Sequence, residues 1–290
     1  MPVVEAPPLP DFLARQMPYA RRAYRLEQGA DAGRLLHFID QGPRDAPCVW
    51  LQHGNPTWCF LWRKVIAQLQ DLRCVAPDLL GLGFADRLPR ASDHTIERHG
   101  AALAELAAAL GIERAILVAQ DWGGPLLLEA ARVREGFACA LLLANTAVIL
   151  PGRSRGSSFH RWARLPVVAK LLFVVGGFPQ NVLHRVQGDP ASIRGGVARA
   201  YRWPLRHFRD RVAPLALARM VPVGDDHPSL AAMRRIEAWT RAFAGPVTLV
   251  WGERDPILGR ALGRHERALP AARVVRTAAV GLESISRELL

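Results

Sequence analysis

The chain has 290 residues, half of them hydrophobic, with 24 glycines and 22 prolines. This composition is typical of a folded globular protein and excludes a fibrous or disordered one. The formal net charge is +12, and all but two of the 38 basic residues are arginines. Because the arginines are scattered along the chain and form no dense block, we expect a solvated surface and no nucleic-acid partner.

The sequence shows no segment typical of membrane insertion or secretion. The apolar run at 166–178 is interrupted by Lys170 and by glycines, so it is too short and too mixed to span a bilayer. The first residues lack the basic start and apolar core of a signal peptide. The four cysteines form no CxxC pair, so we predict free thiols in a reducing compartment. We therefore expect a cytoplasmic protein with no membrane partner.

Apolar runs bounded by turn residues alternate with helical patterns along most of the chain. We predict strands at 34–42, 48–54, 73–78, 114–121, 138–146, 246–255 and 272–277. The helical patterns between them cover 60–70, 94–110, 122–134 and 258–269. Since most of the strand runs are apolar almost throughout, we expect burial on both faces. This indicates the α/β class, with a mostly parallel central sheet flanked by helices.

The alternation of strands and helices stops between residues 147 and 236. This segment is rich in arginine, proline and aromatic residues, and it contains no clear strand pattern. We predict a helical cap at 147–236, inserted after one strand of the sheet. The core domain then comprises residues 1–146 and 237–290.

The end of the run at 114–121 carries the first candidate for chemistry. In open α/β sheets, sites form beyond the carboxyl ends of the strands. Residues 119–123 read AQDWG, a small-x-Asp-x-small pattern. In many hydrolases such a strand-to-helix turn projects a nucleophile, here Asp121. An aspartate that caps the following helix is the alternative interpretation.

Two further strand ends strengthen the interpretation of Asp121 as a functional residue. The turn His-Gly-Asn that follows the second apolar run places the side-chain amide of Asn55 at the same edge of the sheet. Taken alone, it reads as an ordinary Asn-Pro turn. The sequence WGERDP at 251–256 places Asp255 at a third strand end, although a lone Asp-Pro is also usually a turn.

The chain resembles the haloalkane dehalogenases of the α/β-hydrolase superfamily in five segments: HGNPTW, APDLLGLGFADRLP, VAQDWGGP, LLLANT and WGERDP. The resemblance covers about residues 20–260, and the combination of HGNPTW with QDWGG is its most specific part. It implies the α/β-hydrolase fold with an inserted helical cap. It also implies that Asp121 is the nucleophile and that Asp255 is the triad acid.

The resemblance extends to one branch of this family. In another branch the acid lies earlier, at the position that Asn145 occupies here, so the similarity is to the branches whose acid lies later. The pair Asn55 and Trp122 resembles the branch that binds halide with one asparagine and one tryptophan. The backbone N–H groups of the same two residues are expected to form the oxyanion hole.

The chemistry of these residue types agrees with the resemblance. A carboxylate, with an ordinary pKa of about 3.9, is ionised at neutral pH and attacks an sp³ carbon without the help of a base. The side-chain N–H groups of Trp122 and Asn55 would stabilise the departing halide. The expected partners are a small halogenated alkane, water and a halide ion, and no metal or organic cofactor is implied.

The family's general base, a histidine after the last strand, has no counterpart in the sequence. Leu282 stands at its expected position, and no histidine follows His265. We therefore expect impaired hydrolysis of the ester on Asp121, or a segment 278–290 that is truncated or frameshifted relative to the native protein. His37, His94 and His99 lie away from the strand ends and are expected to be structural.

Two other functions stay open from the sequence. Epoxide hydrolases share the aspartate turn, but they usually protonate the epoxide with two tyrosines of the cap, and only Tyr201 lies in this cap. A non-catalytic binding protein would keep the pocket without the base. The sequence gives no indication of chain-length preference, halide preference or oligomeric state.

Overall fold

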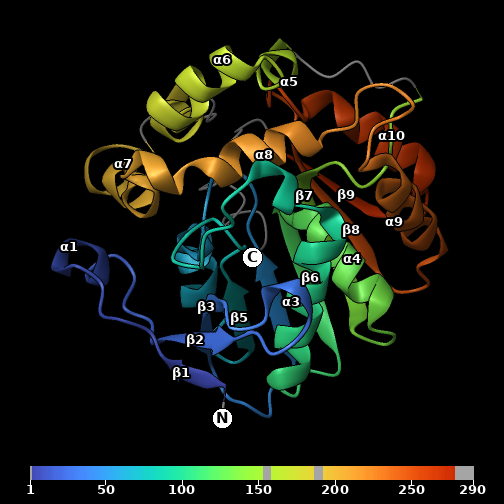
Figure 1. Ribbon diagram of the computed structural model, residues 1–290. Helices are drawn as coiled ribbons and strands as arrows, with labels where there is room; N and C mark the ends of the chain where they lie inside the picture. Colours follow the sequence, from blue (N-terminus) through green and yellow to red (C-terminus); the bar gives the residue numbers. More distant parts are fainter. Residues whose placement is uncertain (1, 153–157, 186–191, 278–290) are drawn as a thin grey trace.

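A single twisted sheet forms the centre of the molecule (Figure 1). The computed structural model describes residues 2–152, 158–185 and 192–277. Within these ranges the sheet has nine strands in the order β1-β2-β3-β5-β4-β6-β7-β8-β9. They are β1 (Val3–Glu5), β2 (Arg21–Arg25), β3 (Leu35–Gln41), β4 (Cys48–Gln52), β5 (Arg73–Pro77), β6 (Ala115–Asp121), β7 (Ala138–Thr146), β8 (Val247–Gly252) and β9 (Arg273–Thr277).

The direction of the strands divides the sheet into two parts. Strands β1, β2, β3 and β5 pair antiparallel to one another. All pairs from β5 through β4, β6, β7 and β8 to β9 are parallel. The prediction of a mostly parallel sheet is therefore confirmed, and each predicted strand is present with slightly different ends. The parallel strands bring their carboxyl ends to one edge of the sheet, where the candidate residues lie.

Two apolar clusters bury the two faces of the sheet. Along β4, Val49 and Leu51 belong to one cluster and Trp50 to the other, as the alternation of side chains along a strand requires. Every residue of β4 and β5 is buried. Full burial on both faces explains why these strands read as continuous apolar runs in the sequence.

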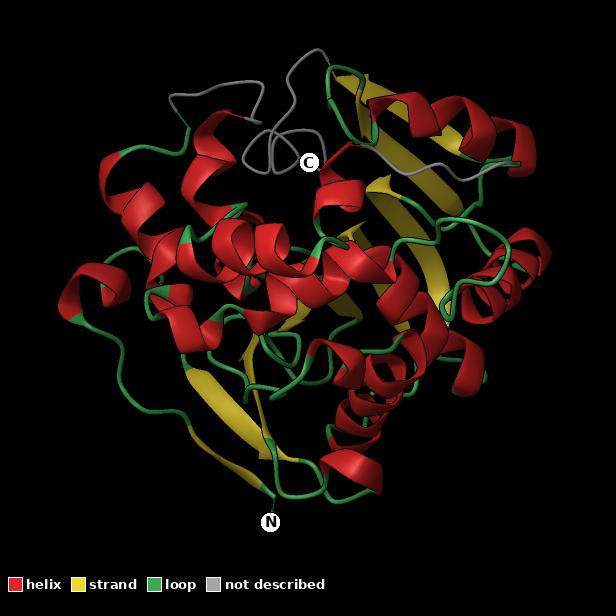
Figure 2. Ribbon diagram, turned by 45° about the horizontal axis from the view of Figure 1, so that its top comes forward, coloured by secondary structure: helices red, strands yellow, loops and turns green. Residues whose placement is uncertain are grey.

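Helices cover both faces of the sheet (Figure 2). The α-helices are α1 (Asp11–Ala14), α2 (Arg63–Gln68), α3 (Ile96–Ala109), α4 (Gly123–Val133), α5 (Ser158–Trp162), α6 (Pro166–Ala169), α7 (Gly195–Arg202), α8 (Val212–Met220), α9 (Leu230–Ala242) and α10 (Leu262–Ala268). Shorter turns are η1 (Gly29–Asp31), η2 (Cys59–Trp62), η3 (Ala91–Asp93), the π-helical η4 (Lys170–Val175), η5 (Gln180–Arg185), η6 (Trp203–Leu205), η7 (Phe208–Asp210) and η8 (Gly259–Ala261). Helices α3 and α4 pack against each other beside the sheet.

Between β7 and β8 the described residues form helices joined by loops, and they contain no strand. In Figure 1, α8 runs between the sheet and the outer helices α5 and α6. Helix α9 begins at Leu230, ahead of the expected domain boundary at 236, and packs against α4 of the core. The division of the chain into a core and a cap at 147–236 stays a prediction.

The cysteines carry free thiols, and most of them are buried. The thiols of Cys48, Cys59 and Cys74 are buried, and all four cysteines are free, as predicted. Burial raises the pKa of the Cys48 thiol to about 12, so this group is unreactive. None of the described helices combines the length and the apolar character needed to cross a membrane.

Candidate active site

Asp121 lies at a sharp turn between β6 and α4. Its φ angle is 53°, in the left-handed region that non-glycine residues seldom adopt and that often marks a functional site. The chain around it leaves no room for larger residues. A Cβ atom on Gly54 would lie 2.6 Å from the Cβ atom of Asp121, and one on Gly123 would lie 2.5 Å from the carbonyl oxygen of Gln52.

Two backbone N–H groups bind the Asp121 carboxylate. The N–H of Asn55 donates to Oδ1 at 2.8 Å, and the backbone N–H of Trp122 donates to the same carboxylate. Burial raises the pKa of Asp121 to about 6, the two N–H groups oppose this shift, and the nearby charge of Asp255 adds to it. The carboxylate is therefore charged at neutral pH but poorly solvated, which favours nucleophilic attack.

Asn55 connects the core to the helical segment above it. Its side-chain Nδ2 donates to the carbonyl oxygen of Pro214 in α8 at 3.1 Å. An amide NH₂ group carries two hydrogens, so one remains for a ligand. The Oδ1 atom of Asn55 is buried and has no hydrogen-bond partner among the described residues. The sequence did not indicate the contact with Pro214, because it joins segments 159 residues apart.

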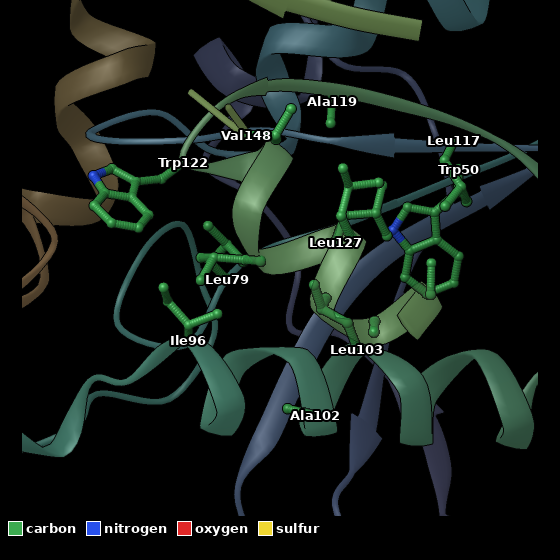
Figure 3. Packing of buried hydrophobic residues seen from close by; sticks show 14 of the residues in the cluster. Trp50, Leu79, Ile96, Ala102, Leu103, Leu117, Ala119, Trp122, Leu127 and Val148 are labelled. Carbon is green, nitrogen blue, oxygen red and sulfur yellow. The ribbon is translucent and has the colours of Figure 1, made fainter. Parts of the chain in front are cut away.

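Trp122 follows the nucleophile candidate and packs at the edge of the larger apolar cluster. Figure 3 shows its indole ring in the same cluster as Leu79, Ile96 and Val148. The side chain is 9% exposed. No group in the described part of the chain accepts a hydrogen bond from its indole N–H, so this donor is available to an anion.

Asp255 and Asn145 meet at the ends of the neighbouring strands β7 and β8. The Nδ2 atom of Asn145 donates to Oδ2 of Asp255 at 3.0 Å, and its Oδ1 accepts from the N–H of Gly252 at 2.8 Å. The backbone N–H groups of Ile257 and Leu258 donate to Oδ1 of Asp255. Asn145 thus orients the carboxylate of Asp255, a role that sequence reasoning missed.

Three buried histidines, His94, His99 and His265, hydrogen-bond to groups other than Asp121. His265 accepts from the backbone N–H groups of Val148 and Ile149, both at 3.3 Å, and its Nδ1 lies 2.8 Å from the carbonyl oxygen of Ala261. His94 and His99 face each other at 3.1 Å. Burial lowers the pKa of His265 and of His94 to about 4, so both are uncharged at neutral pH. Leu282 lies outside the described residues.

Two observations bear on the other chemistries considered from the sequence. The described residues contain no group of three or more His, Cys, Asp or Glu side chains placed to hold a metal ion. Tyr201 is 1% exposed, and its ring packs edge-on against Phe60 at 5.1 Å. Both rings belong to the same apolar cluster.

Comparison with known proteins agrees with the fold. Residues 47–282 match the model of the alpha/beta hydrolase fold family, so the chain belongs to this class of proteins. It is 33% identical over 233 residues to the haloalkane dehalogenase of Mycobacterium marinum, and the match spans 78% of this chain and 74% of that protein. The chain therefore belongs to the haloalkane dehalogenase family within the α/β-hydrolase superfamily.

Two further proteins are similar to this chain over most of its length. The solved structure of the tetrameric haloalkane dehalogenase DpaA from Paraglaciecola agarilytica NO2 superposes with a TM-score of 0.79 at 21% identity, covering 99% of this chain and 95% of that one. It supports the fold. The chain is also 28% identical over 260 residues to the cis-3-alkyl-4-alkyloxetan-2-one decarboxylase of Xanthomonas campestris, and the match covers 84% of each. These comparisons favour neither the epoxide hydrolase nor the non-catalytic alternative.

Proposed function

We propose that this protein is a haloalkane dehalogenase that cleaves carbon–halogen bonds through an alkyl ester on Asp121. The observation that carries this proposal is the Asp121 carboxylate at the strained turn, bound by the N–H groups of Asn55 and Trp122. A carboxylate at this position attacks an sp³ carbon directly, whereas a serine there would first need a base.

The first step displaces the halide. An oxygen of Asp121 forms a bond to the carbon that bears the halogen, and the carbon–halogen electron pair leaves with the halide. The indole N–H of Trp122 and the second amide N–H of Asn55 stabilise the halide in a site of low polarity, where such donors have the largest effect. The Asn55–Pro214 hydrogen bond fixes the direction of the amide.

The second step hydrolyses the ester. A water molecule attacks the ester carbonyl of Asp121, and the backbone N–H groups of Asn55 and Trp122 stabilise the oxyanion. Asp255 is the triad acid, which orients a histidine base. With leucine at position 282 in place of that histidine, we propose that this step is slow. The pair Asn55 and Trp122, together with a late acid at Asp255, supports the assignment of the chain to the branch with these halide donors.

The proposal also covers the cap, the reactants and the location of the protein. The helical segment 147–236 acts as the cap of the site, and the Pro214 contact with Asn55 supports its placement over the nucleophile. Water and the halogenated alkane are the only reactants, and no cofactor takes part. The free thiols support a cytoplasmic location.

Halide affinity tests the assignment of Trp122 and Asn55. We expect bromide or iodide to quench part of the tryptophan fluorescence saturably, and the saturable part to disappear in Trp122→Phe. Asn55→Ala is expected to weaken halide affinity by roughly 1–3 kcal/mol, the usual effect of losing a buried donor. Equal quenching in the wild type and Trp122→Phe would remove Trp122 from the halide site.

The pH dependence of the first turnover tests the state of Asp121. Because its raised pKa is about 6, the carboxylate is protonated and unreactive below that pH. We expect the first-turnover rate of halide release to be constant above about pH 7 and to fall about tenfold per pH unit below 6. Asp255→Asn should move the profile to lower pH, since the charge of Asp255 raises the pKa of Asp121. A flat profile between pH 5 and 8 would contradict this assignment.

The reaction itself is tested with three substrates in parallel. Halide release from 1-bromohexane supports the proposed dehalogenation, while diol formation from styrene oxide would support an epoxide hydrolase instead. The similarity to the Xanthomonas decarboxylase over 84% of both chains favours a second candidate, decarboxylation of a cis-3-alkyl-4-alkyloxetan-2-one. Release of CO₂ from such a lactone without halide release from any bromoalkane would replace the first proposal by the second.

A further inference from the structure

The outer helices of the cap expose a continuous series of large apolar side chains. Helices α5 and α6 lie on the outside of the molecule, beyond α8 (Figure 1), and η4 continues α6 directly. Their exposed side chains define the outer cap surface: Trp162, Leu165, Val167, Val168, Leu171 and Val175, with exposed fractions from 41% to 70%. Apolar side chains gathered in this way usually mark an interaction site.

The same part of the chain carries almost all of the protein's net charge. Residues 147–220 contain thirteen arginine or lysine residues and two aspartates, against a net charge of +12 for the whole chain. No acidic residue occurs between positions 147 and 188. Arg161 and Lys170 are exposed within the outer cap surface. Further exposed basic side chains of the cap are Arg199, Arg202, Arg206 and Arg209.

We propose that the outer cap surface docks onto anionic lipid membranes. Apolar side chains on a short helix, accompanied by arginine and lysine, are the features of segments that lie in the bilayer interface. A basic side chain near an anionic leaflet contributes about fivefold to the binding constant. The exposed indole of Trp162 is of the type that prefers the headgroup layer. The segment lies on the membrane and does not span it. Its short length and Lys170 exclude a transmembrane helix but are compatible with docking, so the proposal departs from the expectation of no membrane partner.

The charge of the cap disfavours a second copy of this chain as the occupant. An interface between two copies through this surface would bring two strongly basic caps together, and like charges across an interface oppose association. An anionic lipid surface has the opposite charge and also accepts the apolar side chains. Charge complementarity therefore selects the membrane.

Docking would place the cap at a reservoir of apolar molecules. Halogenated alkanes dissolve in the hydrocarbon layer, so a cap seated on the bilayer would bring the proposed active site close to its substrate; this consequence alone rests on the proposed function. Membrane binding itself is independent of catalysis, and it can be measured without any substrate.

Vesicle sedimentation with the full chain tests the proposal. We expect the protein to sediment with vesicles of phosphatidylcholine and phosphatidylglycerol in equal amounts, and to bind vesicles of phosphatidylcholine alone at least about tenfold more weakly. Raising the salt concentration should weaken binding. The fluorescence of Trp162, isolated by comparison with Trp162→Phe, should shift to shorter wavelength when anionic vesicles are added.

A double substitution separates apolar docking from simple charge attraction. Val167→Asp with Leu171→Asp should weaken binding to anionic vesicles at least about tenfold, since it places two carboxylates in the apolar layer. The matched control is Val4→Asp with Val133→Asp, which makes the same charge change at two exposed apolar residues outside the cap and should bind within about threefold of the wild type. Circular dichroism confirms that both variants are folded.

Three results would overturn the proposal. The first is that the wild type stays in the supernatant when anionic vesicles are sedimented. The second is that the cap variant binds anionic vesicles as tightly as the control variant does. In the third, light scattering would show an oligomer that only the cap variant dissociates, and vesicles would not compete with it. That result would identify a second copy as the occupant. Halide release from a soluble bromoalkane is measured separately, so failure of docking leaves the proposed dehalogenation intact.

Discussion

Replacement of Asp121 by alanine is expected to abolish halide release from bromoalkanes. The carboxylate supplies the nucleophile. In the described chain no second group accepts hydrogen bonds from the backbone N–H groups of Asn55 and Trp122 in its place. Loss of a nucleophile that works as a unit with its neighbours lowers the rate by roughly 10⁴–10⁶-fold. The measurement is first-turnover halide release by ion chromatography, with wild type and variant at equal concentration.

The Asp121→Ala variant needs a control for folding and for charge. Removal of a poorly solvated carboxylate relieves an unfavourable burial, so the variant should melt no more than a few degrees from the wild type. Asp45→Ala removes the same charge at an exposed position and should release halide at the wild-type rate. Halide release by Asp121→Ala at more than about a hundredth of the wild-type rate would show that another group or water performs the displacement.

Introduction of histidine at position 282 is expected to convert a single event into continued turnover. Displacement by Asp121 needs no base, but hydrolysis of the ester does, and general-base catalysis contributes about 10²–10⁴-fold. The chain with leucine at 282 should therefore release about one halide per chain in a burst and then nearly stop. Leu282→His should raise the steady-state rate by about 10²–10⁴-fold.

The control for this substitution is Leu282→Gln, which adds polarity without a group that titrates near neutral pH. It should leave the steady-state rate close to that of the wild type. Asp255→Asn in the Leu282→His background should remove most of the gain, because the acid no longer orients and stabilises the charged imidazole. Sustained multiple turnover by the wild type would contradict a slow ester step.

The parallel core of the fold followed from the sequence because its strands are buried on both faces. Because every residue of β4 and β5 is buried, these strands appear in the sequence as apolar runs. Turn residues on either side mark where each run begins and ends. Strands β1 and β2 were missed for the opposite reason. They form the antiparallel edge of the sheet, and β2 reads Arg-Arg-Ala-Tyr-Arg, which resembles a solvated loop.

The candidate site was predictable where its residues lie in short local motifs. Asp121 and Trp122 share one turn, and Asn55 lies in a second, so their positions at strand ends could be read from the chain. The hydrogen bonds from Asn145 to Asp255 and from Asn55 to Pro214 join segments 110 and 159 residues apart. Contacts of this kind depend on the packing of the whole chain and leave no local pattern.

The central claim is tested most directly by the mass of the protein after reaction with 1-bromohexane. Intact-mass spectrometry should show one hexyl group added per chain, with release of an equal amount of bromide. Digestion should place the hexyl group on the peptide that contains Asp121, and Asp121→Ala should show no adduct. Two results would contradict the account. One is an adduct on a cysteine peptide. The other is halide release during which neither the wild type nor Asp255→Asn carries a hexyl group on Asp121.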